Sequence, residues 1–301
     1  MTVKLIRLST VFIGALAIVS STALLADGIT EKREALRVCA DPNYMPFSHK
    51  DKSGYENQIA DLIGKELKLP VTYTWFPQRM GFIRNTLKKK EFGSDKYRCD
   101  LVIGVPKEFD FAKATIPYMH STYALVTLKE GKLKELKQGN DLVKLPSEKL
   151  DDIKIGITER SPGAVWLARY ALYGQMTPYI AQSGDPDEFP NQPMYNDLLA
   201  GKIDAAIVWG PTAAYFSRLS PKKINFLPLQ SERGVRFDFS ISTAVRYGDD
   251  KWKNQIEAIL RKNTDKINEI LNKAGIPLLA NKIKENSGKD GDNKPAVTAS
   301  N

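Results

Sequence analysis

The chain has few of the residues that enzymes most often use for catalysis and metal binding. Among its 301 residues are two histidines and two cysteines. His49 and His120 stand in different segments, so they suggest neither a metal cluster nor a catalytic triad. The sequence also lacks the G-x-S-x-G elbow, the phosphate-binding G-x-x-x-x-G-K-[ST] motif and the dinucleotide-binding G-x-G-x-x-G motif. These absences argue against an enzyme and against a metal site.

Long apolar runs are confined to the N-terminus. Lys4 and Arg7 precede the run VFIGALAIVSSTALLA at 11–26, and small residues at Ala23 and Ala26 offer cleavage points. This order is typical of a secretory signal peptide, which we place at residues 1–26, and it predicts a periplasmic protein. No later segment reaches the roughly 18 apolar residues that a membrane helix needs, so we expect no stable membrane insertion.

An excess of negative charge is also missing. The net charge is +9, and removal of Lys4 and Arg7 with the leader leaves +9 − 2 = +7. The lysines mostly alternate with acids, as in KEGKLKELK at 129–137, and no basic face carries interleaved aromatics. This pattern predicts a solvated surface and no nucleic-acid binding, and it leaves an acidic protein partner open.

The two cysteines lie next to apolar strand patterns, Cys39 in LRVCA and Cys99 in CDLVIGV. An exported chain meets an oxidising compartment, so the pair predicts a disulfide. The bridge is geometrically reasonable if the two strands are neighbours in a parallel sheet. The alternative is a pair of buried thiols.

Strand and helix patterns alternate along the first part of the mature chain, which predicts a parallel sheet flanked by helices. The apolar run at 99–105 is typical of a central strand covered on both faces. The expected strands are 36–40, 71–75, 99–105 and 123–128, and the expected helices are 57–67 and 81–90.

A charged stretch at 129–152 shows little periodicity, and then the alternation resumes. A single long helix is expected over 249–273, closed by Gly275, and residues 286–301 are expected to be disordered. The other expected strands are 153–157, 203–209, 224–229 and 239–245, and the other expected helices are 163–174 and 195–201.

This order of elements resembles the bacterial extracellular solute-binding proteins, the two-lobed receptors of ABC importers. The likeness is carried by RVCADPNYMPFS at 37–48, GYENQIADLIGKEL at 54–67, CDLVIGVPKEFDFAKATIPYMHSTYALVT at 99–127 and NDLLAGKIDAAIVWGPTAAYF at 196–216. The resemblance implies an α/β, two-lobed periplasmic binding protein fold of type II, with mixed, mostly parallel sheets and two hinge crossings. Lobe 1 would comprise 27–127 and 240–285, and lobe 2 would comprise 128–239.

Within that family the same segments resemble the MoxJ, MxaJ and XoxJ proteins, which are encoded beside quinoprotein methanol dehydrogenases. The segment WFPQRMGFIRNTL at 75–87 is more similar to the XoxJ branch, which is encoded beside the lanthanide-dependent dehydrogenase. One departure is KKKEFGSDKYRCD at 88–100, which is longer and more basic than the usual link before the second cysteine.

The loop after the first strand occupies the place of the first cleft loop in that family. Ligands in open α/β sheets bind outside the carboxyl ends of the strands. Asp41 and Asn43 would therefore serve as polar anchors of a ligand cleft, and Tyr44 and Phe47 as its apolar walls.

Further cleft candidates follow the next strands. Trp75, Gln78 and Arg79 would supply stacking surface and polar groups, with Arg79 holding a carboxylate; the alternative is a surface arginine packed on Trp75. Gly104 would permit close backbone approach.

The second half supplies three more cleft candidates. Ser161 and Gly163 begin a helix whose N–H groups suit an anion. Trp209 would close over the cleft, and the alternative is a core tryptophan.

The resemblance implies a non-enzymatic protein that assists the assembly or activation of a methanol dehydrogenase. Its expected partners are that enzyme or its cytochrome c, with a small-molecule ligand left open and the protein itself a monomer. No tightly bound cofactor is expected, and pyrroloquinoline quinone is a candidate transient ligand. The alternative is an ABC-importer receptor for a small solute other than an amino acid, because GVPKEFDFAKAT at 104–115 has Lys107 where amino-acid receptors carry an arginine.

Overall fold

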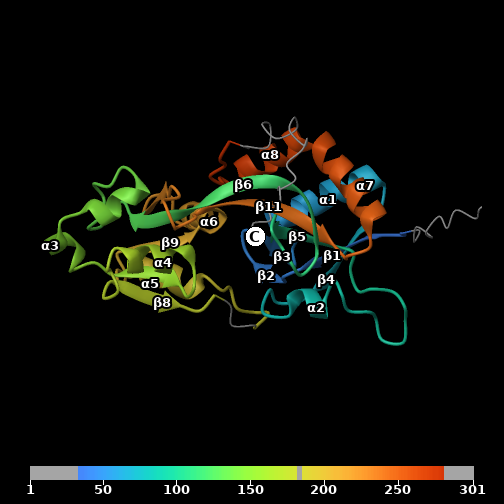
Figure 1. The fold of residues 1–301 in the computed structure, drawn as a ribbon, viewed down its shortest axis with the longest axis horizontal. Helices are drawn as coiled ribbons and strands as arrows, with labels where there is room; N and C mark the ends of the chain where they lie inside the picture. The colour runs from blue at the N-terminus through green and yellow to red at the C-terminus, as the bar shows by residue number, and fades with distance from the viewer. Residues whose placement is uncertain (1–32, 182–184, 281–301) are drawn as a thin grey trace, which may run out of the picture. The chain divides into compact units, whose positions relative to one another are not determined.

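The computed structural model describes residues 33–181 and 185–280. The predicted signal peptide at 1–26 and the predicted disordered tail at 286–301 lie outside the described residues. The helices and strands below are numbered as in Figure 1.

A nine-stranded mixed sheet runs through the described part of the chain in the order β4-β1-β5-β11-β6-β9-β7-β8, with β10 also paired to β6. Strand β1 lies between β4 and β5, parallel to both, and β7 is parallel to β8 and β9. In the first half of the sheet order, the strands are β1 (Leu36–Ala40), β4 (Val71–Trp75), β5 (Leu101–Pro106), β11 (Asp238–Val245) and β6 (Lys113–Leu128). Those of the second half are β7 (Ile155–Thr158), β8 (Met176–Tyr179), β9 (Ala205–Trp209) and β10 (Ile224–Pro228).

Strand β6 connects the two halves of the sheet. It pairs antiparallel with β11 over its first part, and with β9 and β10 over Tyr123–Leu128. Within the described sheet of nine strands, every antiparallel pair involves β6 or β11. The lobe boundaries that the resemblance implies, 127/128 and 239/240, fall in these two strands, and the exact boundaries stay a prediction.

The length of β6 is the main difference from the expected strand at 123–128. Residues 113–122 were not predicted as strand because they include Pro117, and proline cannot donate a hydrogen bond to a central ladder. In the structure Pro117 lies opposite Ser242, where the register between β6 and β11 shifts. A bulge of this kind accommodates a proline inside a paired strand.

Three helices cover one face of the β4-β1-β5-β11 part of the sheet, namely α1 (Tyr55–Leu67), α7 (Asp250–Lys262) and α8 (Thr264–Lys273) (Figure 1). The single helix expected over 249–273 is wrong in one respect, since it breaks at Asn263. The buried Asn263 side chain donates from Nδ2 to the Ile259 carbonyl at 3.0 Å. A side chain that bonds back to the preceding turn offers an alternative to helical continuation.

Among the described helices, only the short helix α2 (Phe82–Asn85) covers the opposite face of that sheet. The helix expected over 81–90 is therefore shorter than predicted. The buried Thr86 hydroxyl donates to the Phe82 carbonyl at 2.7 Å, and the Thr86 backbone leaves the helical region at φ −119° and ψ −87°. The chain then continues without helix to β5.

The predicted disulfide between Cys39 and Cys99 is confirmed, with their Cα atoms 5.5 Å apart. It joins β1 to the residues just before its neighbour β5. Both cysteines are buried beside Phe82 and Ile83, so the bridge forms part of the small core under α2.

The second half contains elements that sequence patterns did not indicate. Strand β8 and helix α6 (Gly210–Leu219) were missed, α6 because its opening Gly-Pro resembles a turn, although proline is favoured in the first helical turn. The stretch at 129–152 holds two short helices. The remaining helices are η1 (Gly139–Lys144), α3 (Ser147–Leu150), α4 (Pro162–Arg169) and α5 (Gln192–Leu199).

Residues after α8 return to β6 near the crossing. The Ser121 hydroxyl donates to the Pro277 carbonyl at 2.7 Å, and the Leu279 N–H donates to the His120 carbonyl at 2.9 Å. The C-terminal described residues therefore hold the central strand where it passes from one half to the other.

Candidate functional site

The loop after β1 is fixed by the side chain of Asp41. Its Oδ1 accepts from the Asn43 N–H at 2.8 Å and its Oδ2 accepts from the Gln78 N–H at 2.5 Å. Burial raises the pKa of Asp41, and the two backbone hydrogen bonds partly oppose that rise. Asp41 thus ties the first loop to the loop after β4, and both its oxygens already have partners.

The aromatic residues of this loop pack inward. The rings of Tyr44 and Phe47 stack with centroids 4.6 Å apart, and Phe47 also lies 5.7 Å from Tyr55. Phe47 is 8% exposed and belongs to the core under α1. Burial raises the pKa of the half-buried Tyr44, as do the nearby Tyr123, Glu56 and Asp41. The structure therefore places Phe47 in the core, and Tyr44 at its margin.

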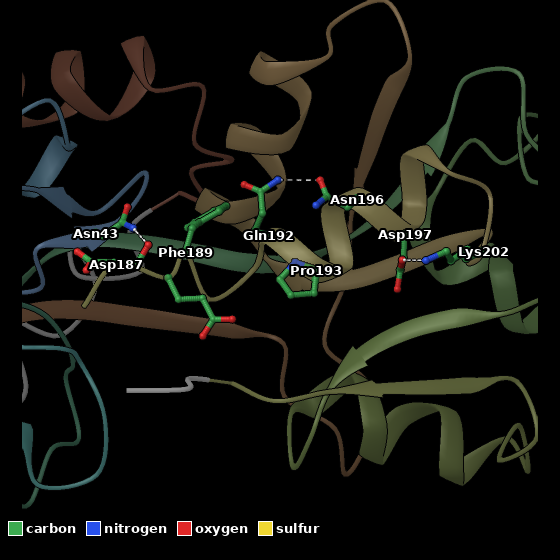
Figure 2. Close-up of a pocket in the computed structure, with 9 residues that line it drawn as sticks. Asn43, Asp187, Phe189, Gln192, Pro193, Asn196, Asp197 and Lys202 are labelled. Atoms are coloured by element: carbon green, nitrogen blue, oxygen red, sulfur yellow. Dashed lines mark hydrogen bonds and ion pairs between the residues drawn. The ribbon is translucent and has the colours of Figure 1, made fainter. Parts of the chain in front are cut away.

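Asn43 reaches the second half of the molecule. It lies in β2 (Asn43–Tyr44), which pairs with β3 (Ser48–His49), and its Nδ2 donates to the Asp187 carbonyl at 3.0 Å. Figure 2 shows this bond at one end of a pocket of about 580 Å³, whose other residues come from 187–202. Seven of its nine lining residues have polar or charged side chains, and Asp197 is paired to Lys202 at 2.9 Å.

Gln78, Arg79 and Gly104 line a different and larger pocket, of about 710 Å³. It opens on the α2 side of the sheet. The Arg79 guanidinium lies 5.5 Å from the Phe76 ring, so the arginine packs on Phe76 and not on Trp75. The other residues that line this pocket are Met80, Gly81, Phe82, Ile83, Arg84, Lys88, Val102, Val105, Pro106, Phe109 and Phe111. The arrangement combines apolar walls with three cationic side chains.

The lack of a side chain at Gly104 makes room for a buried carboxyl group, that of Glu56. Gly104 has φ +84°, and a Cβ there would lie 2.0 Å from Glu56 Oε1. Burial raises the pKa of Glu56 well above its usual range, and the nearby Asp41 raises it further. The sequence alone does not indicate this contact, because only the fold brings Glu56 to Gly104.

Trp75 belongs to a third opening, at the outer edge of β4. Its ring stacks on Tyr73 with centroids 4.5 Å apart and planes 9° from parallel. Both rings line a groove of about 660 Å³ together with Thr74, Lys89, Lys90, Glu91, Phe92 and Arg98. Trp75 therefore does not line the pocket of Gln78 and Arg79.

The two candidates at the start of α4 have structural partners. The Ser161 N–H donates to the Thr158 carbonyl at 3.2 Å, so it is not available to an anion. A Cβ on Gly163 would lie 2.6 Å from Ile207 Cγ2, which shows that this glycine lets α4 pack on β9. The Ser161 hydroxyl is buried without a hydrogen-bond partner among the described residues.

Trp209 lies in an aromatic cluster where β6, β9 and β11 meet. Its ring is 5.3 Å from Tyr123 and 6.1 Å from Phe239. It is half-buried, so it takes part in the core at the crossing and also keeps some exposed surface. Burial in the same cluster raises the pKa of Tyr123 to about 12.

The predicted site residues are thus divided among three openings and the core. Within residues 33–181 and 185–280, no group of three or more His, Cys, Asp or Glu side chains is placed to hold a metal ion. None of the described helices combines the length and apolar character needed to cross a membrane. What the arrangement offers chemically is binding, through an apolar pocket with cations and a polar pocket at Asn43.

Comparisons with known proteins connect this arrangement to a family. No protein-family model matches the chain. The crystal structure of the periplasmic binding protein XoxJ from Methylobacterium extorquens AM1 is 34% identical, with a TM-score of 0.65, covering 82% of this chain and 100% of that one. The structure of MxaJ from Methlophaga aminisulfidivorans MPT is 26% identical, with a TM-score of 0.67, covering 81% and 100%.

A curated relative agrees with the two structures. Protein MoxJ of Methylorubrum extorquens is 26% identical over 274 residues, which is 86% of each chain. The fold, the coverage and the identity to XoxJ all indicate the same family, and they confirm the resemblance carried by the four sequence segments. The chain belongs to the XoxJ, MxaJ and MoxJ family of periplasmic binding proteins.

Proposed function

We propose that this chain is a periplasmic accessory protein of a quinoprotein methanol dehydrogenase, acting without catalysis of its own in the assembly or activation of that enzyme. We extend the proposal to the lanthanide-dependent XoxF type, because the identity to XoxJ, 34%, exceeds the 26% to MxaJ. Family membership supports this role, and the geometry of the openings adds to it.

The proposal rests on one observation: the polar groups around the first loop already have partners within the protein. Both oxygens of Asp41 accept backbone N–H groups, Asn43 donates to the Asp187 carbonyl, and Gly104 is closely approached by Glu56. A receptor for a small polar solute needs several polar groups that converge on the ligand. Here those groups are occupied by the protein itself, which favours a different kind of partner.

The pocket beside α2 suits an aromatic acid. Pyrroloquinoline quinone, the cofactor of such dehydrogenases, is a planar ring system with three carboxylates. Arg79, Arg84 and Lys88 line the pocket with Phe109 and Phe111, so cations and aromatic walls stand together. Guanidinium groups hold carboxylates in bidentate fashion, and aromatic walls hold flat rings. We propose transient contact with the quinone there and no tightly bound cofactor.

Charge supports a protein partner as well. The chain carries 44 basic and 35 acidic residues, a net charge of +9 that becomes +7 without Lys4 and Arg7. Long-range attraction to an acidic dehydrogenase or its cytochrome c speeds encounter and weakens as salt rises.

The test combines calorimetry with reconstitution of the enzyme. The mature protein is titrated with the quinone and with a panel of small solutes, and quinone-free dehydrogenase is reactivated with and without it. We expect faster or more complete reactivation in its presence, and weak quinone binding that Arg79→Gln reduces. Arg160→Gln, in the second half, is the matched control and should behave as wild type.

A second candidate function is supported by the polar pocket at Asn43. Its volume of about 580 Å³ is large enough for a small solute, and its residues come from both halves of the molecule. That geometry suits a receptor of an ABC importer. Tight binding of a solute, with no effect on the dehydrogenase, would replace the accessory role with this one.

A further inference from the structure

Residues 89–98 form a small hairpin between α2 and β5. Figure 1 shows this segment as a teal loop that extends away from α2 and β4. Its backbone pairs, from the base outward, are Arg98 N–H to Lys89 O at 2.9 Å, a bridge between Lys90 and Tyr97, and Glu91 N–H to Lys96 O at 2.9 Å. An ion pair of 2.7 Å between Lys90 and Asp95 adds to these. The segment is therefore an ordered hairpin.

The base of the hairpin is fixed to the core by Tyr97. The Arg246 guanidinium lies 4.1 Å from the Tyr97 ring, and Arg37 Nη1 donates to the Tyr97 carbonyl at 2.8 Å. Two residues later the disulfide of Cys99 joins the chain to β1. A surface held in place in this way loses little conformational freedom when it binds.

The tip presents a phenylalanine to solvent. The side chain of Phe92 is fully exposed, at 107% of its reference surface. Gly93 follows at φ +69°, a conformation that lets the hairpin turn sharply. Aromatic residues are enriched among the few side chains that supply most of the binding energy of protein interfaces.

The same segment concentrates the positive charge of the protein. Residues 84–98, the hairpin with the five residues before it, contain six basic residues and two acidic ones, 6 − 2 = +4, against +9 for the whole chain, and the hairpin 89–98 itself contributes 4 − 2 = +2. Within the described part of the chain, Lys89 and Lys96 form no ion pair with a carboxylate. Over the rest of the chain lysines mostly alternate with acids, as at 129–137, whereas residues 88–90 are three consecutive lysines.

A groove runs beside the hairpin along the edge strand β4. Its floor is the stacked pair of Tyr73 and Trp75, and its wall is formed by Lys89, Phe92 and Arg98. Strand β4 ends the order of the large sheet, so its outer edge has no neighbouring strand among the described residues. The hairpin and the groove together offer an aromatic anchor, cations and a sheet edge.

We infer that the 89–98 hairpin, with the groove along β4, is the surface that docks on an acidic face of the partner protein. The inference rests on the proposed function, so the partner is the methanol dehydrogenase. Phe92 enters an apolar depression on the partner, and Lys89 and Lys96 face carboxylates around it. The charge of the segment determines the sign of the partner surface, and the exposed ring requires a protein with a depression to receive it.

The experiment measures binding of the full mature protein to purified dehydrogenase at several salt concentrations. We expect Phe92→Ser to weaken binding at least tenfold and Phe92→Leu to retain most of it. The double variant Lys89→Glu with Lys96→Glu should weaken binding and flatten its salt dependence. Tyr173→Ser, which is 68% exposed, and Lys149→Glu with Lys222→Glu are matched controls in the second half.

Two results overturn the inference, and they are distinguishable. If wild type binds the dehydrogenase and the hairpin variants bind equally well, the docking surface lies elsewhere and the accessory role stands. If wild type does not bind at any salt concentration, the proposed function fails and the inference falls with it. Circular dichroism and thermal unfolding of each variant check that only the surface has changed.

Discussion

The two faces of the sheet formed by β4, β1, β5 and β11 are covered very differently. One face lies under α1, α7 and α8, whose buried side chains form a continuous core with the strands. In the part of the chain that the structure describes, α2 is the one helix on the other face, with Phe82, Ile83 and the disulfide as its small core. Met80 is 98% exposed and Phe111 65% exposed on that second face.

The two faces are therefore suited to different roles, one to stabilising the fold and the other to contact with a partner. Fully covered apolar surface stabilises a fold, whereas apolar surface left open beside cations is available to a partner. The α2 face holds the pocket of Arg79 and leads to the 89–98 hairpin. We therefore expect core truncations on the covered face to reduce stability more than those beside α2, and surface changes around α2 to affect binding more than folding.

The largest loss is expected for Asp100→Asn. Asp100 is fully buried, and its carboxylate accepts from Arg37 Nε at 2.6 Å and from Arg246 Nη2 at 2.9 Å. Removing one partner of a buried ion cluster leaves uncompensated charge and costs roughly 3–5 kcal/mol. Urea unfolding measures this loss. Asp250→Asn, an exposed ion-pair residue, is the control, and an equal loss there would contradict the prediction.

Matched core truncations compare the two faces directly. Ile256, on the inner face of α7, is fully buried, and Ile83 is 9% exposed beside the α2 pocket. Ile256→Ala should reduce the free energy of unfolding by roughly 2–5 kcal/mol. Ile83→Ala should cost less, about 1–2 kcal/mol, because its surroundings are already open on one side. Equal losses in denaturant titrations would show that the faces are packed alike.

The disulfide should contribute mainly through the unfolded state. It closes a separation of 60 residues between Cys39 and Cys99. Replacing both cysteines by alanine should lower stability by roughly 2–4 kcal/mol. Binding of the dehydrogenase should weaken less than with Phe92→Ser, provided the variant remains folded at the assay temperature. Unfolding of wild type with and without reductant provides the control.

A pH dependence is expected from Glu56 on the covered face. Its folded-state pKa is raised by burial, so the native state keeps the proton while the unfolded chain ionises above about pH 4.5. Stability from this group is present below that pH and is lost as pH rises toward the folded pKa, at up to about 1.4 kcal/mol per pH unit.

Glu56→Gln tests that dependence. The stability of wild type relative to this variant should decrease as pH rises from about 4.5, because glutamine has no proton to lose. Asp61→Asn, exposed on the same helix, should leave the pH profile of stability unchanged. A wild-type profile parallel to that of Glu56→Gln would contradict burial of the neutral acid.

Sequence reasoning located most strands and the disulfide. These rest on local signals, since apolar runs predict strands and two cysteines in an exported chain predict a bridge. The break at Asn263 and the helix α6 were not predicted. Both depend on details that a periodic pattern does not carry, namely a buried side-chain hydrogen bond and a proline that starts a helix.

The site was harder to predict because its contacts join distant residues. Nothing near Asp41 in the sequence indicates that its carboxylate accepts from the Gln78 N–H, 37 residues away. In the same way, Gly104 suggested a ligand, and the fold brings Glu56 there instead. Trp75 and Arg79 are four residues apart and line different openings, because the chain leaves β4 between them.

The return of residues 277–279 to β6 has a consequence for motion. Ser121 and His120 hold residues 277–279 where the central strand leaves one half for the other. Any swing of the two halves must bend β6 at this brace or break its hydrogen bonds, because hinges act through a few residues that change their backbone angles. These two hydrogen bonds brace β6 at the crossing from residues that are far in sequence from the three openings described above, and shortening the chain to Gly275 would remove them.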